Sequence, residues 1–564
     1  MFAIVASTDA AEPVRQWQAT PARPFVLRGT ERRLLDRAER FLADEQWDDA
    51  IGALIRLLEQ DNFRLIAVDD QRYISLTEYC HRLIAKLPVE SLARYRNLVD
   101  ATAKSVYRQG IENRDQAQLQ QVIDKYFCSN WGDDALLALG ELALQRGDYQ
   151  TARNAWLQIG PPLGATDDRL IFPGTDVSLA AVAARLVLVA VREGDWERAE
   201  RELAKLRENF PTATGRIGES EGVLVDLLAS LLKQARRWPE LVAPTDWRTF
   251  AANSQRTNAS AAPAPKGLYE LVWSQPIANE QLSVFPVVIN DLVVFQDAIS
   301  VRALRLNDGE RVFTAQGDVF RSPVTSPEWQ GQLRHTLTAT DRYLFGVTMS
   351  PLGVRHKSEG DERNSVLWSL DLERDGAIAF HRPSEDASIG FVGAPVVKGT
   401  RLFVPIRSHE QTARAGIACY DTSTGERCWQ RWLCQANTPA TGWAHELATN
   451  LLTYDSGILY VNTNLGAVAA VRADDGQILW LRTYERQSAN LDGGKGKFDS
   501  YRGPSPCVYH RGAVYLSPTD SKSLFTLDAT SGEKLWQHET ADGSLRVLSI
   551  QDQLQIQSSQ GLQA

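Results

Sequence analysis

The sequence lacks long hydrophobic runs, paired cysteines and an excess of basic residues. No eighteen consecutive apolar residues occur in the 564-residue chain, so the sequence predicts no helix that spans a bilayer. The six cysteines contain no CxxC pair and no adjacent pair, which excludes a zinc site or a disulfide framework of the usual spacing and predicts buried free thiols. With 61 Lys and Arg against 70 Asp and Glu, the net charge of −9 argues against a nucleic-acid partner.

The chain begins MFAIVASTDAAE. Its apolar stretch from Phe2 to Ala6, followed by small residues, is typical of the end of a signal peptide and its cleavage zone, but the basic start of such a peptide is missing. Two interpretations of residues 1–27 therefore stay open, a signal-peptide remnant or an N-terminal tail. The first of these predicts a location in the periplasm or cell envelope.

Residues 28–249 have the apolar spacing of helices and repeat one template. An aromatic residue is followed by Ala three positions later and by a large apolar residue four positions after that, in EQWDDAIGALIRLL (45–58), GDYQTARNAW (147–156) and GDWERAEREL (194–203). We expect Gly147 and Gly194 each to end one helix, and the following Asp to cap the next. The spacing resembles the tetratricopeptide repeat of about 34 residues, although a plain α-solenoid without a ligand explains it as well.

The composition changes at residues 250–267. FAANSQRTNASAAPAPK contains small and polar residues, two prolines and no apolar period, which predicts a linker. As a random coil its ends would lie roughly 20–25 Å apart, so we expect the two halves of the chain to move relative to each other unless they dock.

From residue 268 to residue 564 the apolar period changes to two, which indicates β-strands. Four stretches read as strand, tight turn and strand: 286–295, 394–406, 450–462 and 506–518. Each leads to a third strand, a polar turn with glycine and a fourth strand with an aromatic residue. The glycines are Gly309, Gly376, Gly425, Gly476 and Gly532, and the aromatics four residues later are Phe313, Phe380, Trp429, Trp480 and Trp536.

A four-stranded antiparallel unit that recurs at intervals of roughly 50–70 residues predicts the blades of a β-propeller. We expect the turn glycine to supply a positive φ and the aromatic to close the seam to the next blade. Residues 268–276, with Trp273, look like an outermost strand that no blade precedes, and residues 544–564 look like a blade without its last strand. Either the two complete a ring of about six blades, or the chain is a fragment.

The turn motif resembles the repeat of PQQ-type, quinoprotein-like propellers, A-x-D-x-x-T-G-x-x-x-W. TLDATSGEKLW at 526–536 is the best match, CYDTSTGERCW at 419–429 keeps Asp421, and AVRADDGQILW at 470–480 has Arg472 at the Asp position. Helices followed by such a propeller are also similar to the layout of large planctomycete proteins. The resemblance implies a propeller and two functions: a dehydrogenase that holds PQQ and Ca²⁺, or a protein-binding scaffold like the lipoprotein of the outer-membrane β-barrel assembly machinery.

The residues favour the scaffold. Enzymes of this family commonly wall the cofactor with a disulfide between adjacent cysteines, which this sequence lacks, and no carboxylate–Asn set for Ca²⁺ stands out. HELATN at 445–450 lacks the second His of a zinc protease, and DGGKGK at 492–497 does not fit a phosphate loop. We therefore expect no catalytic, cofactor or metal residues in a non-catalytic protein-binding scaffold of the cell envelope, with the PQQ- and Ca²⁺-dependent dehydrogenase as the alternative.

One long connection between blades suits a partner surface. Residues 484–503 read YERQSANLDGGKGKFDSYRG and mix aromatic with basic side chains. The residues concerned are Tyr484, Arg486, Lys495, Lys497, Tyr501 and Arg502. A solvated insertion with no partner is the other interpretation.

Overall fold

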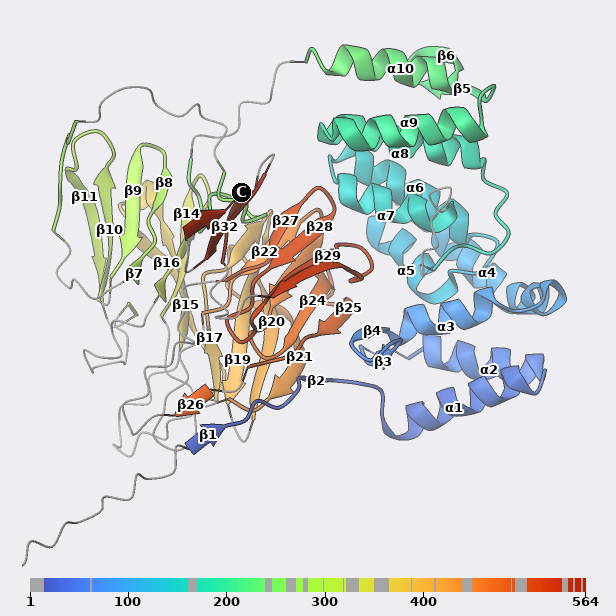
Figure 1. The fold of residues 1–564 in the computed structure, drawn as a ribbon, viewed down its shortest axis with the longest axis horizontal. Coiled ribbons are helices and arrows are strands. Elements are labelled where there is room, and N and C mark those ends of the chain that lie inside the picture. The colour runs from blue at the N-terminus through green and yellow to red at the C-terminus, as the bar shows by residue number, and fades with distance from the viewer. Residues whose placement is uncertain are drawn as a thin grey trace, which may run out of the picture.

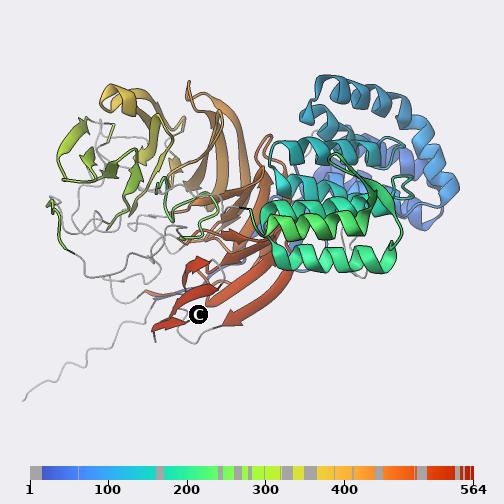
Figure 2. The same cartoon turned by 90° about the horizontal axis from the view of Figure 1, so that it is seen from above.

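The computed structural model describes most of both halves of the chain. The described residues are 15–60, 63–160, 170–238, 246–259, 270–276, 283–297, 299–317, 319–320, 334–348, 365–386, 388–409, 412–438, 449–487, 489–491, 505–539, 546–550, 553–558 and 561–563. Figures 1 and 2 show a stack of helices on one side and a set of sheets on the other.

The N-terminal half is helical, as its apolar spacing predicts. The helices in its described part are α1 (Gly29–Ala43), α2 (Trp47–Leu58), α3 (Leu76–Ala85), α4 (Val89–Asn113), α5 (Gln116–Tyr126), α6 (Gly132–Gln145), α7 (Tyr149–Ile159), α8 (Leu179–Glu193), α9 (Trp196–Asn209) and α10 (Leu224–Ala235). Two short hairpins interrupt them, β3 (Leu65–Ala67) with β4 (Arg72–Ser75), and β5 (Thr214–Ile217) with β6 (Ser220–Val223). No helix of the described residues is both long and apolar enough to cross a membrane.

The repeated template forms helical hairpins. Gly147 and Gly194 have positive φ and end a helix, while the side chains of Asp148 and Asp195 accept hydrogen bonds from backbone N–H groups in the first turns of α7 and α9. The alanine of each template is fully buried, which lets α7 pack closely on α6 and α9 on α8. The prediction of helix ends and caps is thus confirmed, and the identification of the hairpins as tetratricopeptide repeats stays a prediction.

The C-terminal half consists of successive antiparallel sheets, which confirms the predicted repeat of four-stranded units. Blade 1 has β8 (Val287–Ile289), β9 (Leu292–Gln296), β10 (Ser300–Arg305) and β11 (Arg311–Gln316); blade 2 has β13 (Leu337–Ala339), β14 (Tyr343–Thr348), β15 (Val366–Asp371) and β16 (Ala377–Pro383). Blade 3 has β17 (Ile389–Phe391), β18 (Val396–Lys398), β19 (Arg401–His409), β20 (Ala413–Asp421) and β21 (Arg427–Ala436). Blade 4 has β22 (Leu452–Asp455), β23 (Ile458–Asn462), β24 (Ala467–Arg472) and β25 (Ile478–Thr483). Blade 5 has β27 (Val508–His510), β28 (Ala513–Leu516), β29 (Ser523–Asp528) and β30 (Lys534–Glu539), and the described part of the sixth sheet has β31 (Arg546–Ile550), β32 (Leu554–Ser558) and β33 (Gly561–Gln563).

The first strand of each blade lies at the centre. β8 contacts β13, β22 contacts both β18 and β27, and β27 contacts β31, so the first strands of neighbouring blades pack against one another. Because the strands of a blade are antiparallel, the turns between strands one and two and between strands three and four lie at the same end of the ring. We call this the short-turn end and the opposite one the loop end.

Four of the five recurring aromatics lie against the turn glycine of the next blade, and Trp273 lies against the turn glycine of blade 1. A Cβ atom on Gly532 would come within 2.5 Å of the Trp480 ring, and the Trp480 indole N–H also donates to the carbonyl of Ala529, at 3.0 Å. The five glycines have φ between 67° and 75°, so each needs both its backbone freedom and its missing side chain. The pairs are Trp273 with Gly309, Phe313 with Gly376, Phe380 with Gly425, Trp429 with Gly476, and Trp480 with Gly532.

At the two ends of this series of contacts the structure differs from the predicted strands and seams. Residues 270–276 form no strand, because no strand of the described residues pairs with them, so the predicted outermost strand at 268–276 is wrong there. Trp273 nevertheless lies on Gly309 and donates to the carbonyl of Leu306, at 2.9 Å. At the other end Trp536 is 39% exposed and contacts the ring of Tyr515 edge-on.

The helical half docks on the propeller by adding strands to it. β4 pairs antiparallel with β25, the outermost strand of blade 4, with Ile74 opposite Trp480. β2 (Arg23–Pro24) pairs in the same way with β21 of blade 3, and Figure 1 shows β2 and the β3–β4 hairpin beside these blades. Both sheets thereby gain strands from the N-terminal half. Residues 23–24 belong to the segment predicted as a tail or signal-peptide remnant, and they pair with the propeller.

All six cysteines are free, as predicted, and five of them are buried, Cys428 being the exposed one. Burial raises the pKa of the Cys80 thiol to about 12, so this thiol is neutral at pH 7 and packs as a small apolar group.

Trp480→Ala should lower the free energy of unfolding by about 3–5 kcal/mol, because Trp480 is 1% exposed and its removal leaves a cavity at the seam. Trp536→Ala is the matched control, since the same substitution at a partly exposed ring should cost about 1 kcal/mol. Urea unfolding followed by far-UV circular dichroism measures both. Equal losses in the two variants would contradict the role of the seam contact.

Candidate functional site

The helices cover the short-turn end of blades 4 and 5. The Thr151 hydroxyl of α7 donates to the carbonyl of Ser456 in a turn of blade 4, at 3.0 Å. Asn154 of the same helix accepts a hydrogen bond from the Thr530 hydroxyl of blade 5, at 2.9 Å. Tyr509, at the centre of blade 5, donates to the Gln150 side chain at 2.9 Å, and both side chains are buried. Helix α7 and blades 4 and 5 therefore form a specific polar interface at the short-turn end.

Arg472 marks the docking site in the sequence. In the turn of blade 5 Asp528, at the Asp position of the repeat motif, accepts the backbone N–H groups of Thr530 and Ser531. Blade 4 has Arg472 at the corresponding position, where it bonds Asp124 of α5 at 2.7 Å and Asp475 of its own turn at 2.6 Å. The hydrogen bond and charge of Arg472 help to hold the pKa of Asp475 below its usual value. The departure from the motif thus coincides with the contact to the helices.

The segment between the halves runs along the inner strands of the blades. Residues 247–258, which we call the connector, bond the first strands of blades 1, 2, 4 and 5 and of the sixth sheet. The backbone groups of Trp247 and Val288 bond each other in both directions, at 2.8 and 2.9 Å. Four further backbone N–H groups of inner strands donate to connector carbonyls: Ala339 to Arg248 (2.7 Å), Tyr454 to Ser254 (2.9 Å), Tyr509 to Gln255 (3.0 Å) and Ile550 to Thr257 (3.0 Å). Residues 250–258 are therefore not the random coil that their composition predicted, because their polar backbone groups pair with the inner strands. The two halves dock, which is the case in which we did not expect them to move relative to each other.

Arg256 fixes the connector to blade 4. Its side chain is 1% exposed and donates to the carbonyl of Leu452 at 2.9 Å and to Thr249 and the carbonyl of Phe250, both at 2.7 Å. Burial lowers the pKa of Arg256 to about 9, and no carboxylate of the described residues contributes to this shift. A buried charge held only by neutral acceptors is costly, so these three bonds determine where the connector lies.

The connector also has an unusual backbone. Ala251, Ala252, Arg256 and Asn258 have φ between 51° and 71°, a region that residues with a side chain rarely adopt. Such conformations persist only where the surroundings over-determine them. The bonds to the inner strands supply that constraint.

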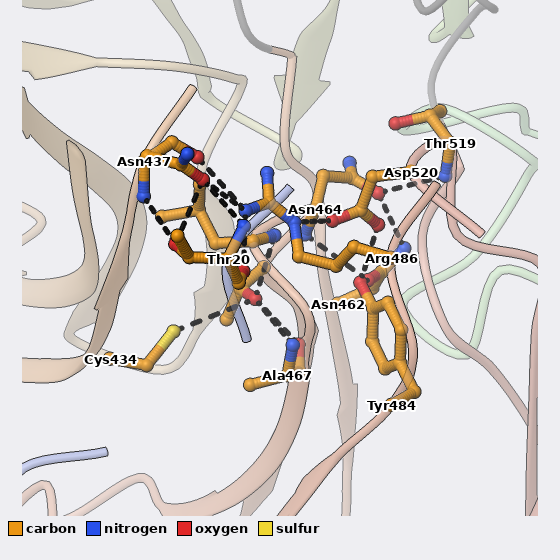
Figure 3. A network of polar contacts seen from close by, with 12 residues as sticks. Thr20, Cys434, Asn437, Asn462, Asn464, Ala467, Tyr484, Arg486, Thr519 and Asp520 are labelled. Atoms are coloured by element: carbon orange, nitrogen blue, oxygen red, sulfur yellow. Dashed lines mark hydrogen bonds and ion pairs between the residues drawn. The ribbon is translucent and has the colours of Figure 1, made fainter. Parts of the chain in front are cut away.

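A second polar network lies at the loop end (Figure 3). Arg486 bonds Asp520 at 2.8 Å and donates to the carbonyls of Asn437 at 2.9 Å and Thr20 at 3.1 Å. The Tyr484 hydroxyl donates to the other oxygen of Asp520, at 2.8 Å. Burial and the nearby carboxylate raise the pKa of Tyr484 well above its usual value. This network joins the loops that follow blades 3 and 4 to blade 5 and to the N-terminal segment.

The predicted partner residues divide into two groups. Tyr484 is buried and the Arg486 side chain is 3% exposed, so both turn into the network and do not present the partner surface that the sequence suggested. Lys495, Lys497, Tyr501 and Arg502 lie outside the described residues. The sequence analysis did not find Arg256, Asn437 or Asp520, whose partners are remote in the sequence and leave no local pattern.

Part of the strand half matches the model of a known family. Residues 359–487 and 413–558 match the model of the family described as outer membrane protein assembly factor BamB, which confirms the resemblance to the PQQ-like propeller repeat. No curated protein matches the chain. The planctomycete layout stays a prediction.

Several solved structures are similar to the strand half. They include a quinohemoprotein alcohol dehydrogenase from Comamonas testosteroni (17% identity, TM-score 0.37, 53% of this chain and 50% of that one) and ADHIIG from Pseudomonas putida HK5 (14%, 0.36, 52% and 48%). BamB from Moraxella catarrhalis is also similar (14%, 0.28, 51% and 83%). The chain spans about half the length of the two dehydrogenases. At these scores the likenesses carry no conclusion about activity.

Arg256→Ala should lower the free energy of unfolding by about 2 kcal/mol, because the loss of three hydrogen bonds to buried acceptors outweighs the relief of a buried charge. Hydrogen exchange of residues 247–258 should become faster at the same time. Arg248→Ala is the control on the same segment, since Arg248 is partly exposed and pairs with Asp246 and Asp341, and it should cost less than about 1 kcal/mol. Unchanged exchange in Arg256→Ala would refute the anchoring role.

Proposed function

We propose that the protein is a non-catalytic, protein-binding scaffold of the cell envelope. The observation that carries this proposal is the way in which the helices are fixed to the propeller. Strand pairing of β4 with β25, the Arg472–Asp124 ion pair and the connector across the inner strands hold two repeat architectures in one relative position. A fixed arrangement lowers the conformational entropy that binding a large partner would otherwise cost.

The family description supports a protein partner and an envelope location. The matched model is that of a factor for outer membrane protein assembly, and it covers much of the strand half. Repeat architectures of both kinds present broad surfaces on which partners bind without a cofactor. The helical half lies outside the matched residues, so its contribution to binding belongs to this proposal alone.

The described donor groups do not fit PQQ with Ca²⁺. A hard cation needs several oxygen ligands with negative charge, yet the described residues contain no cluster of three or more His, Cys, Asp or Glu side chains that could hold a metal. Asp520, the carboxylate of the loop-end network, is neutralised by Arg486 and bonded by Tyr484. At the short-turn end the inner strands bond the connector, whose buried guanidinium repels a cation.

The loop end is the surface that we assign to the partner. The short-turn end of blades 4 and 5 is covered by α7 and the connector, whereas the buried Arg486–Asp520 network braces the loops at the opposite end. Residues 492–503 follow Arg486 in the sequence and carry the remaining basic and aromatic side chains of the predicted partner segment, outside the described residues. Binding residues are often found in connections that a rigid scaffold positions.

A thermal-unfolding titration of the full chain with PQQ, with and without Ca²⁺, tests the absence of a cofactor. A ligand at a hundred times its Kd would add about 2.7 kcal/mol to the folded state, so binding would raise the transition clearly. We expect no shift. A Ca²⁺-dependent rise would overturn the proposal in favour of the dehydrogenase.

Deletion of residues 492–503 tests the partner surface, because it removes four candidate contact residues and leaves Tyr484 and Arg486 in their network. After chemical crosslinking in an envelope extract, the deletion variant should form at most about one tenth of the adducts that the full chain forms. Deletion of residues 351–363, another charged insertion, is the control and should leave the adducts unchanged. Equal adducts in both deletions would show that the loop is not the contact.

A further inference from the structure

A cavity of about 260 Å³ lies where the helices meet the propeller. Its walls come from α3, α5 and α7 on one side and from the outer turns of blades 4 and 5 on the other. The helical wall includes Gln120 and Gln158, and the propeller wall includes Gln477, Trp480 and Thr530. This volume is slightly below the range for drug-sized ligand sites, which is roughly 300–1,000 Å³, and so suits a smaller ligand.

The lining is rich in uncharged groups that both donate and accept hydrogen bonds. Five primary amides contribute, each with two N–H donors and a carbonyl acceptor, and hydroxyl groups lie beside them. The amides belong to Gln60, Gln120, Asn154, Gln158 and Gln477, and the hydroxyls to Ser75, Thr77, Thr530 and Ser531.

The charged groups of the lining mostly neutralise one another. Glu78 pairs with Arg82 at 2.7 Å, and Arg472 pairs with both Asp124 and Asp475. Lys125 is the remaining charged side chain of the lining. The lining therefore has three acidic side chains (Glu78, Asp124, Asp475) and three basic ones (Arg82, Lys125, Arg472). An ionic ligand would have to compete with these pairs, whereas a neutral one leaves them intact.

His81 supplies a buried acceptor. It is 1% exposed, and its Nε2 lies 2.9 Å from the carbonyl oxygen of Asp124, to which it donates. Burial lowers the pKa of His81 to about 4, so the ring is neutral at pH 7 and Nδ1 keeps its lone pair. Nδ1 has no hydrogen-bond partner within the described part of the chain. Less than 1 Å² of Nδ1 is exposed, so this atom is a buried acceptor that a ligand in the cavity does not contact.

Apolar surface completes the lining. Ile123, Phe127 and Leu157 contribute from the helices, and Leu479 and Trp480 from blade 4. The C–H groups on the two faces of a polyhydroxylated ring pack against such apolar surface, while the hydroxyl groups at its edge form hydrogen bonds with amides and hydroxyls.

We propose that this cavity binds a neutral, polyhydroxylated ligand of about monosaccharide size. The amides and hydroxyls match the alternating donors and acceptors of a sugar, and the apolar residues receive its ring. The site is separate from the loop end and does not depend on the proposed scaffold function. Because both halves form its walls, the bound sugar also strengthens the docking of α3 and α5 on blade 4.

Saturation-transfer NMR with the full chain tests the site, with glucose and N-acetylglucosamine as probes and glutamate, inorganic phosphate and trialanine as counter-probes. Gln120→Trp places a large ring in the cavity and should weaken saccharide binding at least tenfold. Gln121→Trp is the matched control, since Gln121 is exposed on the same helix outside the lining, and it should bind as the unaltered chain does.

Gln158→Leu provides a second variant that keeps a side chain of similar size and removes one of the lining amides. It should weaken saccharide binding several-fold, so the proposal remains testable if Gln120→Trp fails to fold. The proposal is overturned if neither sugar binds at tens of millimolar. Preferential binding of glutamate, phosphate or trialanine overturns it too, as does saccharide binding that both cavity variants leave unchanged.

Discussion

The propeller depends on the contact between an aromatic ring and a bare glycine. At each seam the ring from one blade fills the space where the next turn has no side chain, and in three of the seams the indole N–H also bonds a carbonyl of that turn. The contact combines apolar burial with a requirement for positive φ, so neither residue tolerates replacement without a change in the other. Sheets that cannot bury both faces alone are thereby joined in sequence.

The helical half uses the same sheets in another way. Outermost strands have unpaired backbone groups, and the chain covers those of blades 3 and 4 with strands from its own N-terminal part. Trp480 takes part in both arrangements, because it lies on Gly532 in the seam and opposite Ile74 in the added strand. Seam and docking site therefore share one residue, which ties the stability of the ring to the placement of the helices.

Local chemistry was readable from the sequence and remote pairing was not. The glycines, the aromatics and the helix caps act within a few residues, so their spacing predicted blades and hairpins correctly. The connector was misread because its backbone bonds partners in five different sheets, and a polar composition looks the same in a coil as in a segment bonded to inner strands. Tyr484 and Arg486 were misplaced for a similar reason, since Asp520 and Asn437 give no local signal. Arg472 is the exception, because its departure from the repeat motif coincides with the docking contact.

The pairing of β4 with β25 also determines the order in which the molecule can be completed. Residues 72–75 leave the ribosome long before residues 478–483, so the β3–β4 hairpin waits for blade 4 while more than two thirds of the chain is still being made. Contacts of such sequence separation are slow to form, and until then the added strands present open edges to other chains. Nascent chains of this protein therefore depend on protection of their N-terminal half, and a premature stop before blade 4 leaves that half without its permanent partner.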